Sequence, residues 1–182
     1  MSGGHGAHGS ENKTVALIIA VLALMLAVAE ILGQKAQTQT LQSNIEASNL
    51  WAFFQAKTIR RTVADTAAEE METLAAALTL NDTQRKVMTD RAARFKATAA
   101  RMESEPDTQE GRKELIARAK VAEKVRDKAG IKHYRFEIAS GAFQIAIVVA
   151  SASVITGIAM LLWGAGGLAV MGLGMLIAGL MG

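Results

Sequence analysis

The chain has 182 residues, with 20 basic and 17 acidic side chains and no cysteine. The absence of cysteine excludes disulfides, thiolate metal sites and a cysteine nucleophile. The net charge of +3 is modest, and no basic cluster is interleaved with aromatic side chains, so nucleic-acid binding is not indicated. Apolar residues concentrate near the two ends of the chain, whereas residues 34–137 carry nearly all the charge. This division is typical of a membrane protein with one module outside the bilayer.

The N-terminal region divides into a flexible tail rich in glycine and histidine, residues 1–13, and an apolar segment, residues 14–33. About 20 residues of helix extend roughly 30 Å, the thickness of the hydrocarbon core. A cleaved signal peptide is the alternative, but no small-residue cleavage site follows Ala29, so we predict an uncleaved membrane anchor. His5 and His8 of the tail are weak evidence for a metal, and we predict no metal site and no cofactor.

The C-terminal region, residues 138–182, contains no charged side chain over 45 residues. This length is too great for one crossing of a bilayer and suits two. Small residues follow a tryptophan at Trp163–Gly167, so we predict the turn there, with one span at 138–162 and another at 163–182. The last span is short, and a re-entrant hairpin is its alternative.

Basic residues near the span ends predict the orientation. Eight of them belong to the middle segment, namely Lys35, Arg118, Lys120, Lys124, Arg126, Lys128, Lys132 and Arg135. Only Lys13 lies on the opposite side of the first span. Because loops rich in lysine and arginine stay in the cytoplasm, we expect the middle segment and the C-terminus to be cytoplasmic and the N-terminus to be outside.

Residues 34–137 carry the periodicity of long helices. Apolar side chains recur every three or four positions, apart from one step of seven after Ile45. They predict a coiled-coil-like seam made of Leu41, Ile45, Ala52, Ala56, Ile59, Val63, Ala67, Met71, Leu74 and Leu78. A turn with a capping signal follows at Asn81–Gln84, and Pro106 interrupts the returning helix. Residues 107–110 then form the expected cap of a third helix.

The lengths of these segments favour an antiparallel hairpin. As helix, residues 34–80 extend roughly 70 Å and residues 82–135 roughly 80 Å, so the outgoing arm matches the two returning pieces together. A compact three-helix bundle is the alternative. We therefore predict an all-α integral membrane protein with three transmembrane helices and a long cytoplasmic antiparallel helical hairpin between the first and the second.

Small residues at helical spacing predict close packing of the spans. In the first span they share a face with Glu30, the one ionisable residue inside a span, which either contacts a partner helix or reaches water from the cytoplasmic end. The predicted packing residues are Ala16, Ala20, Ala23, Ala27, Glu30, Ala142, Ala146, Ala150, Ser153, Gly157, Gly174 and Ala178. Polar residues within the spans are too few to predict a channel from this chain alone.

Two further groups of residues are candidates for binding. Leu50, Trp51, Phe53 and Phe54 place bulk on several faces of one helix, so we predict a partner interface, with burial against the returning arm as the alternative. Lys128, Lys132, Tyr134 and Arg135 lie next to the second span and are predicted to anchor the chain at the lipid surface.

The segment from Asn44 to Arg60, NIEASNLWAFFQAKTIR, together with the preceding span and the small-residue C-terminal spans, resembles a bacterial membrane-protein family known as domain of unknown function 4337. The resemblance runs from about Asn12 to the end, and Asn49–Lys57 is its most specific part. It implies residence in a bacterial inner membrane. It implies no activity and no catalytic residues.

No arrangement of carboxylates, nucleophile and histidine, or phosphate-binding glycines is recognisable, so we predict no enzymatic activity and no catalytic residues. The expected function is that of an inner-membrane scaffold or accessory subunit of a larger membrane complex. The expected partners are membrane lipids, further copies of the chain, and other membrane-protein subunits. A homo-oligomeric assembly that gates permeability, as in a stress or defence effector, is the second hypothesis.

Overall fold

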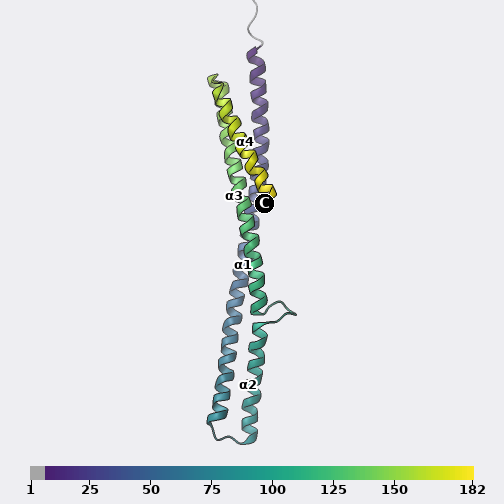
Figure 1. Ribbon diagram of the computed structural model, residues 1–182, viewed down its shortest axis with the longest axis vertical. Helices are drawn as coiled ribbons and strands as arrows, with labels where there is room; N and C mark the ends of the chain where they lie inside the picture. The colour runs from purple at the N-terminus through teal and green to yellow at the C-terminus, as the bar shows by residue number, and fades with distance from the viewer. Residues whose placement is uncertain (1–6) are drawn as a thin grey trace, which may run out of the picture. The chain divides into compact units, whose positions relative to one another are not determined.

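The computed structural model describes residues 7–182, with side chains from Lys13 onward, so the side chains of His5 and His8 and most of the predicted tail lie outside the described residues. The described chain forms four helices and no strand: α1 (Ala7–Ala77), α2 (Asp82–Glu103), α3 (Arg112–Thr156) and α4 (Met160–Met181) (Figure 1). The prediction of an all-helical chain is confirmed. Three of the helices, α1, α3 and α4, are long and apolar enough to cross a membrane.

Two compact units can be distinguished along the chain. The terminal unit combines α1 up to Leu41 with Arg126–Gly182, and the middle unit comprises Gln42–Val125. Both α1 and α3 pass from one unit into the other as continuous helices. Each unit has its own apolar cluster.

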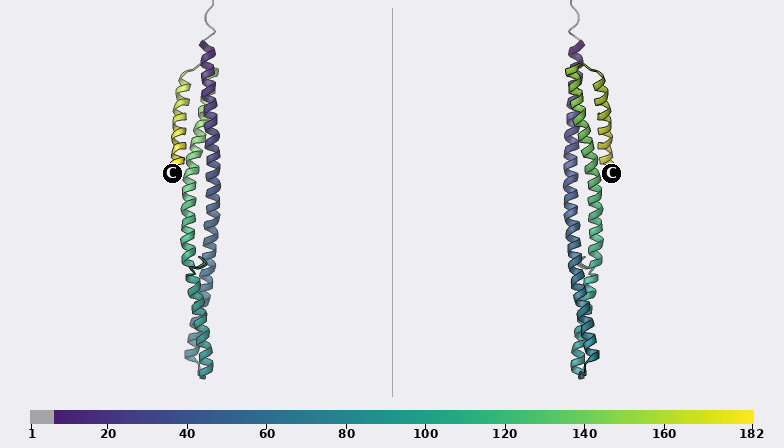
Figure 2. Two further views of the ribbon diagram at one scale, coloured as in Figure 1. Left: turned by 90° about the vertical axis from the view of Figure 1, so that its right-hand side faces the viewer. Right: turned by 90° about the vertical axis from the view of Figure 1, so that its left-hand side faces the viewer.

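In the terminal unit α4 returns along α3, as Figures 1 and 2 show. Two phenylalanine rings of α3 lie against two glycines of α4. A Cβ atom built at Gly172 would lie 2.9 Å from the ring of Phe143, and one at Gly179 would lie 2.5 Å from the ring of Phe136. At the end of α4 the Arg135 guanidinium donates a hydrogen bond of 2.7 Å to the Ala178 carbonyl. This bond satisfies a carbonyl that the last turn of a helix leaves without an intrahelical partner.

The turn between α3 and α4 differs from the prediction. It lies at residues 157–159, and Trp163–Gly167 are helical. Gly157 has a φ of +72°, the left-handed conformation that glycine adopts without a steric penalty and that commonly ends helices. The glycines after Trp163 stay helical, as glycine often does in apolar helices of this length, although a Cβ atom at Gly164, Gly166 or Gly167 would have no neighbour within 4 Å. As a result, α4 has 22 residues, or roughly 33 Å, and its length equals that of a full span.

In the middle unit α1 pairs antiparallel with α2 and with the first part of α3. A capping box begins α2: the Asn81 side chain accepts from the Gln84 amide at 2.8 Å, and the Gln84 side chain accepts from the Asn81 amide at 3.1 Å. This predicted cap is confirmed. Residues 104–111 separate α2 from α3, as the proline predicted. The expected cap at 107–110 does not begin the third helix, because α3 starts only at Arg112.

The predicted seam of α1 is wrong. Ile59 and Val63 are 65% and 64% exposed, and Leu41, Ile45, Leu74 and Leu78 are exposed as well. The side that contacts α2 and α3, which we call the inner face, repeats at strict steps of four and three and comprises Ser43, Ala47, Leu50, Phe54, Lys57, Arg61, Ala64, Ala68, Met71 and Ala75. Alanine prevails on both partners, with Ala92, Ala99 and Ala119 buried on the returning helices. Small side chains let the helix backbones approach each other closely. This close approach determines which side of α1 faces α2 and α3.

Candidate functional site

The aromatic stretch of α1 packs within the middle unit. Leu50 is buried against Leu115, Ala119 and Ala122 of α3, and the half-buried rings of Trp51 and Phe54 border this cluster. The two rings meet edge to face with centroids 5.6 Å apart. The Trp51 indole also donates a hydrogen bond of 2.9 Å to the Glu123 carboxylate.

Two helices therefore cover more of this stretch than the sequence led us to expect, since only Phe53 of the four predicted interface residues is exposed. Phe53 is 37% exposed, and the Lys57 ammonium lies 5.6 Å from the centre of its ring. The prediction that these residues bind a partner rested on the view that a helix pair could not bury them. That view holds for Phe53 alone.

We expect Trp51→Phe to lower the stability of the middle unit by about 1 kcal/mol. The substitution keeps an aromatic ring in place but removes the donor to Glu123, whose half-buried carboxylate can then return to water. Hydrogen exchange on the full-length protein in detergent would measure the loss as faster exchange of the amides around residues 47–54 and 115–123. Equal protection in both proteins would contradict this role for the indole.

Charged side chains around the break between α2 and α3 form a network. Arg112, the first residue of α3, pairs with Glu103, donates 2.9 Å to the Thr58 hydroxyl, and lies 5.0 Å from the centre of the Phe54 ring. Arg61 of α1 also reaches Glu103, at 3.0 Å. One carboxylate thus receives guanidinium groups from two helices, and this arrangement fixes the end of α2 and the start of α3 against α1.

Two further carboxylates hold the connection at residues 104–111. Glu105 accepts hydrogen bonds from Arg101 at 2.6 and 2.9 Å and pairs with the buried Lys57 at 3.4 Å. Glu114 accepts from the Ser104 hydroxyl at 2.7 Å and from the Glu105 amide at 3.2 Å. Gly111 lies directly beneath this arrangement, because a Cβ atom there would contact the Glu114 carboxylate and the backbone of Ser104 and Glu105.

These hydrogen bonds lower the pKa of both carboxyls below their ordinary value near 4.5. For Glu105 the bonds from Arg101 are the main cause, with smaller contributions from Thr108 and Lys57, while desolvation opposes them. For Glu114 the bond from Ser104 is the main cause, followed by backbone amides, and desolvation again acts the other way. Both groups therefore stabilise the folded connection in their ionised form.

We expect the connection at 104–111 to open in acid. A carboxyl whose pKa is lower in the folded state contributes stability above its unfolded value, and this contribution is lost as the pH falls below about 4.5 through the folded value. Hydrogen exchange, corrected for its intrinsic pH dependence, should show residues 104–111 losing protection below pH 4.5 before residues 92–99 do. In the double variant Glu105→Gln, Glu114→Gln, that pH dependence should disappear; if it persists, other groups are responsible.

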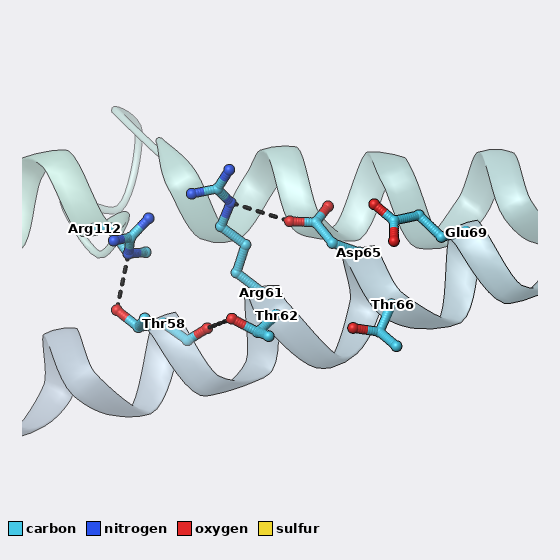
Figure 3. A pocket seen from close by; sticks show the side chains of 7 residues that line it. All are labelled: Thr58, Arg61, Thr62, Asp65, Thr66, Glu69 and Arg112. Carbon is cyan, nitrogen blue, oxygen red and sulfur yellow. Dashed lines mark hydrogen bonds and ion pairs between the residues drawn. The ribbon is translucent and has the colours of Figure 1, made fainter.

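A hollow of about 430 Å³ adjoins this network on α1 (Figure 3). It is lined by Thr58, Arg61, Thr62, Asp65, Thr66, Glu69 and Arg112. Its cations are already engaged, since Arg61 pairs with Asp65 at 3.4 Å and Arg112 with Thr58 and Glu103. In the part of the chain that the structure describes, no cluster of three or more histidine or acidic side chains could hold a metal ion. The geometry is that of a structural ion-pair network.

The predicted packing residues of the spans fall into two groups. Ala142, Ala146, Ala150 and Ser153 of α3 are buried, whereas Gly157 is the exposed turn residue and Gly174 of α4 is exposed, with Ala178 half-buried. On α1 the predicted stripe Ala16, Ala20, Ala23 and Ala27 is exposed throughout. The buried side of α1 in this unit includes Val15, Leu22, Ala29 and Ala36 instead. Packing within the chain uses that face because Leu22, Ala29 and Ala36 meet the phenylalanines of α3.

Glu30 lies on the exposed side of α1, where the Gln144 amide of α3 donates a hydrogen bond of 3.2 Å to its carboxylate. Nearby, the His133 Nδ1 atom lies 3.2 Å from the Gly33 carbonyl. Of the predicted lipid-surface anchors, Lys128 and Tyr134 are exposed, Lys132 is half-buried, and Arg135 binds the end of α4. Arg135 thus has a structural partner that the sequence did not indicate.

Comparison with known proteins places the chain in a family. Residues 11–182 match the family described as domain of unknown function (DUF4337). The chain belongs to that family. The match covers both units of this DUF4337 member, so the helix pairing and the ion-pair network lie within it. No curated protein and no solved structure matches the chain. The resemblance noted in the sequence is therefore confirmed, and membership of DUF4337 brings no activity with it.

Proposed function

We propose that this DUF4337 protein is a non-enzymatic scaffold or accessory subunit of a membrane complex, located in the inner membrane of a bacterium. Three helices would cross the bilayer, and the middle unit would project into the cytoplasm as a coiled-coil-like hairpin. The observation that carries the proposal is the exposure of apolar side chains on the middle unit, with Ile59 and Val63 as the clearest examples. In a segment outside the bilayer such side chains favour contact with another protein.

The polar groups of the middle unit support a binding role. Among the described residues, every buried side-chain nitrogen and oxygen has a hydrogen-bond partner. The two carboxyl groups with lowered pKa values stabilise the connection between α2 and α3, Glu105 through Arg101 and Lys57 and Glu114 through the Ser104 hydroxyl and a backbone amide. We therefore expect the middle unit to act by binding another protein through its surface.

The orientation rests on the basic residues between the spans, and cysteine labelling can test it. Because the chain has no cysteine, a cysteine introduced at the exposed position Lys128 is the only thiol that can be labelled. Its labelling therefore shows on which side of the membrane the middle segment lies. In intact cells a membrane-impermeant maleimide should leave Lys128→Cys unlabelled and should label it after permeabilisation. Labelling in intact cells would place the middle unit outside and would overturn the proposed topology.

The composition of the complex tests the proposed function itself. After gentle extraction from the native membrane, we expect a particle larger than one chain of 19.3 kDa. Other polypeptides in fixed ratio would identify the protein as an accessory subunit, and an integer multiple of its own mass would identify a homo-oligomeric scaffold. Recovery as a single chain, or in the soluble fraction, would contradict both forms of the proposal.

A permeability-gating homo-oligomer is the second candidate, and one observation favours it. Glu30 and Gln144 form an exposed polar pair on segments that belong to candidate spans. In lipid, polar side chains at such positions face other helices or a wet pathway. Induced expression in cells loaded with a permeability dye should then cause leakage that Glu30→Ala reduces, whereas an intact barrier at every expression level would rule this candidate out.

A further inference from the structure

The exposed side of α1 in the middle unit carries a second seven-residue repeat. Its members each stand two positions after a member of the inner face, so that at 100° per residue they lie 200° around the helix, on the opposite side. We call them the outer stripe: Ile45, Asn49, Ala52, Ala56, Ile59 and Val63. The exposed fractions of Ile45, Ile59 and Val63 are 52%, 65% and 64%, so the contacts with α2 and α3 leave the larger members open.

The spacing of the outer stripe is that of a two-helix seam. Its steps of four and three residues place Asn49, Ala56 and Val63 at the first core position of successive heptads and Ile45, Ala52 and Ile59 at the second. An asparagine at the first core position is self-complementary between two copies, because its amide both donates and accepts. Such an asparagine is a known determinant of register in parallel helix pairs.

The residues that flank the outer stripe fit a second copy in the same direction. In a parallel pair in register, Ser48, Gln55 and Thr62 would each face the residue five positions on in the other copy, which is Phe53, Arg60 or Ala67. No like charges meet in this arrangement. Arg60 can donate a hydrogen bond to the Gln55 amide oxygen of the second copy, and the half-exposed Phe53 would be covered.

We propose that the outer stripe binds the outer stripe of a second copy of this chain, with the two α1 helices parallel and in register. This proposal deepens the proposed function and rests on it, because insertion of every copy in one orientation is what makes the helices parallel. Residues 45–63 form roughly 28 Å of helix, a short seam for two free chains. Confinement of both copies to one membrane raises their effective concentration and offsets this shortness.

Cross-linking between introduced cysteines tests the contact in the full-length chain, which has no cysteine of its own. Val63 and Thr62 are neighbours and both are exposed, but they point 100° apart. On isolated membranes, mild oxidation should convert Val63→Cys to a species of twice 19.3 kDa at least about tenfold more efficiently than Thr62→Cys. An Ile59→Glu variant, which places like charges opposite each other, should reduce the native mass of the extracted complex by the contribution of one copy.

Each other result would overturn the proposal. Equal cross-linking at the two positions would indicate random collision, and no cross-linking would leave the stripe without a second copy. Linkage of Val63→Cys to a different polypeptide would assign the stripe to another subunit. In that last case the protein would still be found in a membrane complex, so the proposed function would stand while this inference failed. Absence of the protein from the membrane fraction would instead end the proposed function.

Discussion

Replacement of Leu115 by alanine should destabilise the middle unit by about 2–5 kcal/mol, the range for removing a fully enclosed leucine. Leu115 has no exposed surface and lies at the centre of the cluster with Ala47 and Leu50. Three of its neighbours in this cluster, Ala47, Ala119 and Ala122, are too small to fill the cavity. Hydrogen exchange of the full-length protein in detergent should show the loss across residues 42–77 and 82–125.

Val121→Ala is the matched control on the same helix. Val121 is 61% exposed, so its truncation should change the same exchange rates by no more than about 0.5 kcal/mol. A similar effect of the two substitutions would mean that α3 does not pack on α1 through Leu115. The helices of the middle unit would then have to pair through other residues.

Gly111→Ala should open the connection between α2 and α3, at a cost near the upper end of about 1–3 kcal/mol for an overpacked site. The added methyl group would lie 2.6 Å from the Ser104 Cα atom and would also meet the Glu105 amide and the Glu114 carboxylate. Two of these neighbours are backbone, which cannot rotate away. Exchange at residues 104–111 should therefore rise, and the acid sensitivity of this segment should be lost.

The same substitution at Gly130 provides the control, with the opposite expected sign. A Cβ atom there would have its nearest neighbour 4.0 Å away, at the Thr40 side chain. Because glycine inside a helix is about 1 kcal/mol less favourable than alanine, Gly130→Ala should leave stability unchanged or raise it. If both glycine variants behaved alike, the crowding at Gly111 would not be the cause.

The sequence predicted the helices, the capping box and the break at Pro106 because these features depend on local chemistry. The sequence did not predict correctly which side of α1 is buried in the middle unit. Bulky residues such as Ile59 and Val63 suggested a buried seam, yet α1 packs through alanines and through long polar side chains such as Lys57 and Arg61. Bulk is a poor guide to burial where helices approach through small residues. The inner face and the outer stripe share the same seven-residue spacing, so spacing alone could not show which side of α1 is buried.

The C-terminal turn and the charged network were missed for different reasons. Small residues after Trp163 suggested a turn, but glycine is also frequent inside long apolar helices, and only the backbone conformation of Gly157 shows where α3 ends. The network joins Arg61 and Arg112 to Glu103 across a turn and a loop, so no spacing along the chain reveals it. Leu50, Trp51 and Phe54 were predicted to bind a partner, with burial against the returning arm as the alternative, and their contacts with α3 depend on which side of α1 is buried.

The two phenylalanine rings of α3 that rest on glycines of α4 fix the register of the two helices. Phe136 and Phe143 are seven residues apart, as are Gly172 and Gly179, and the helices are antiparallel. A slide of α4 by one residue would bring Met171 or Leu173 to Phe143 in place of Gly172, and Ala178 or Leu180 to Phe136 in place of Gly179. The larger side chains beside the two glycines therefore oppose a sliding movement of α4 along α3. We therefore expect α3 and α4 to move together when the terminal unit opens.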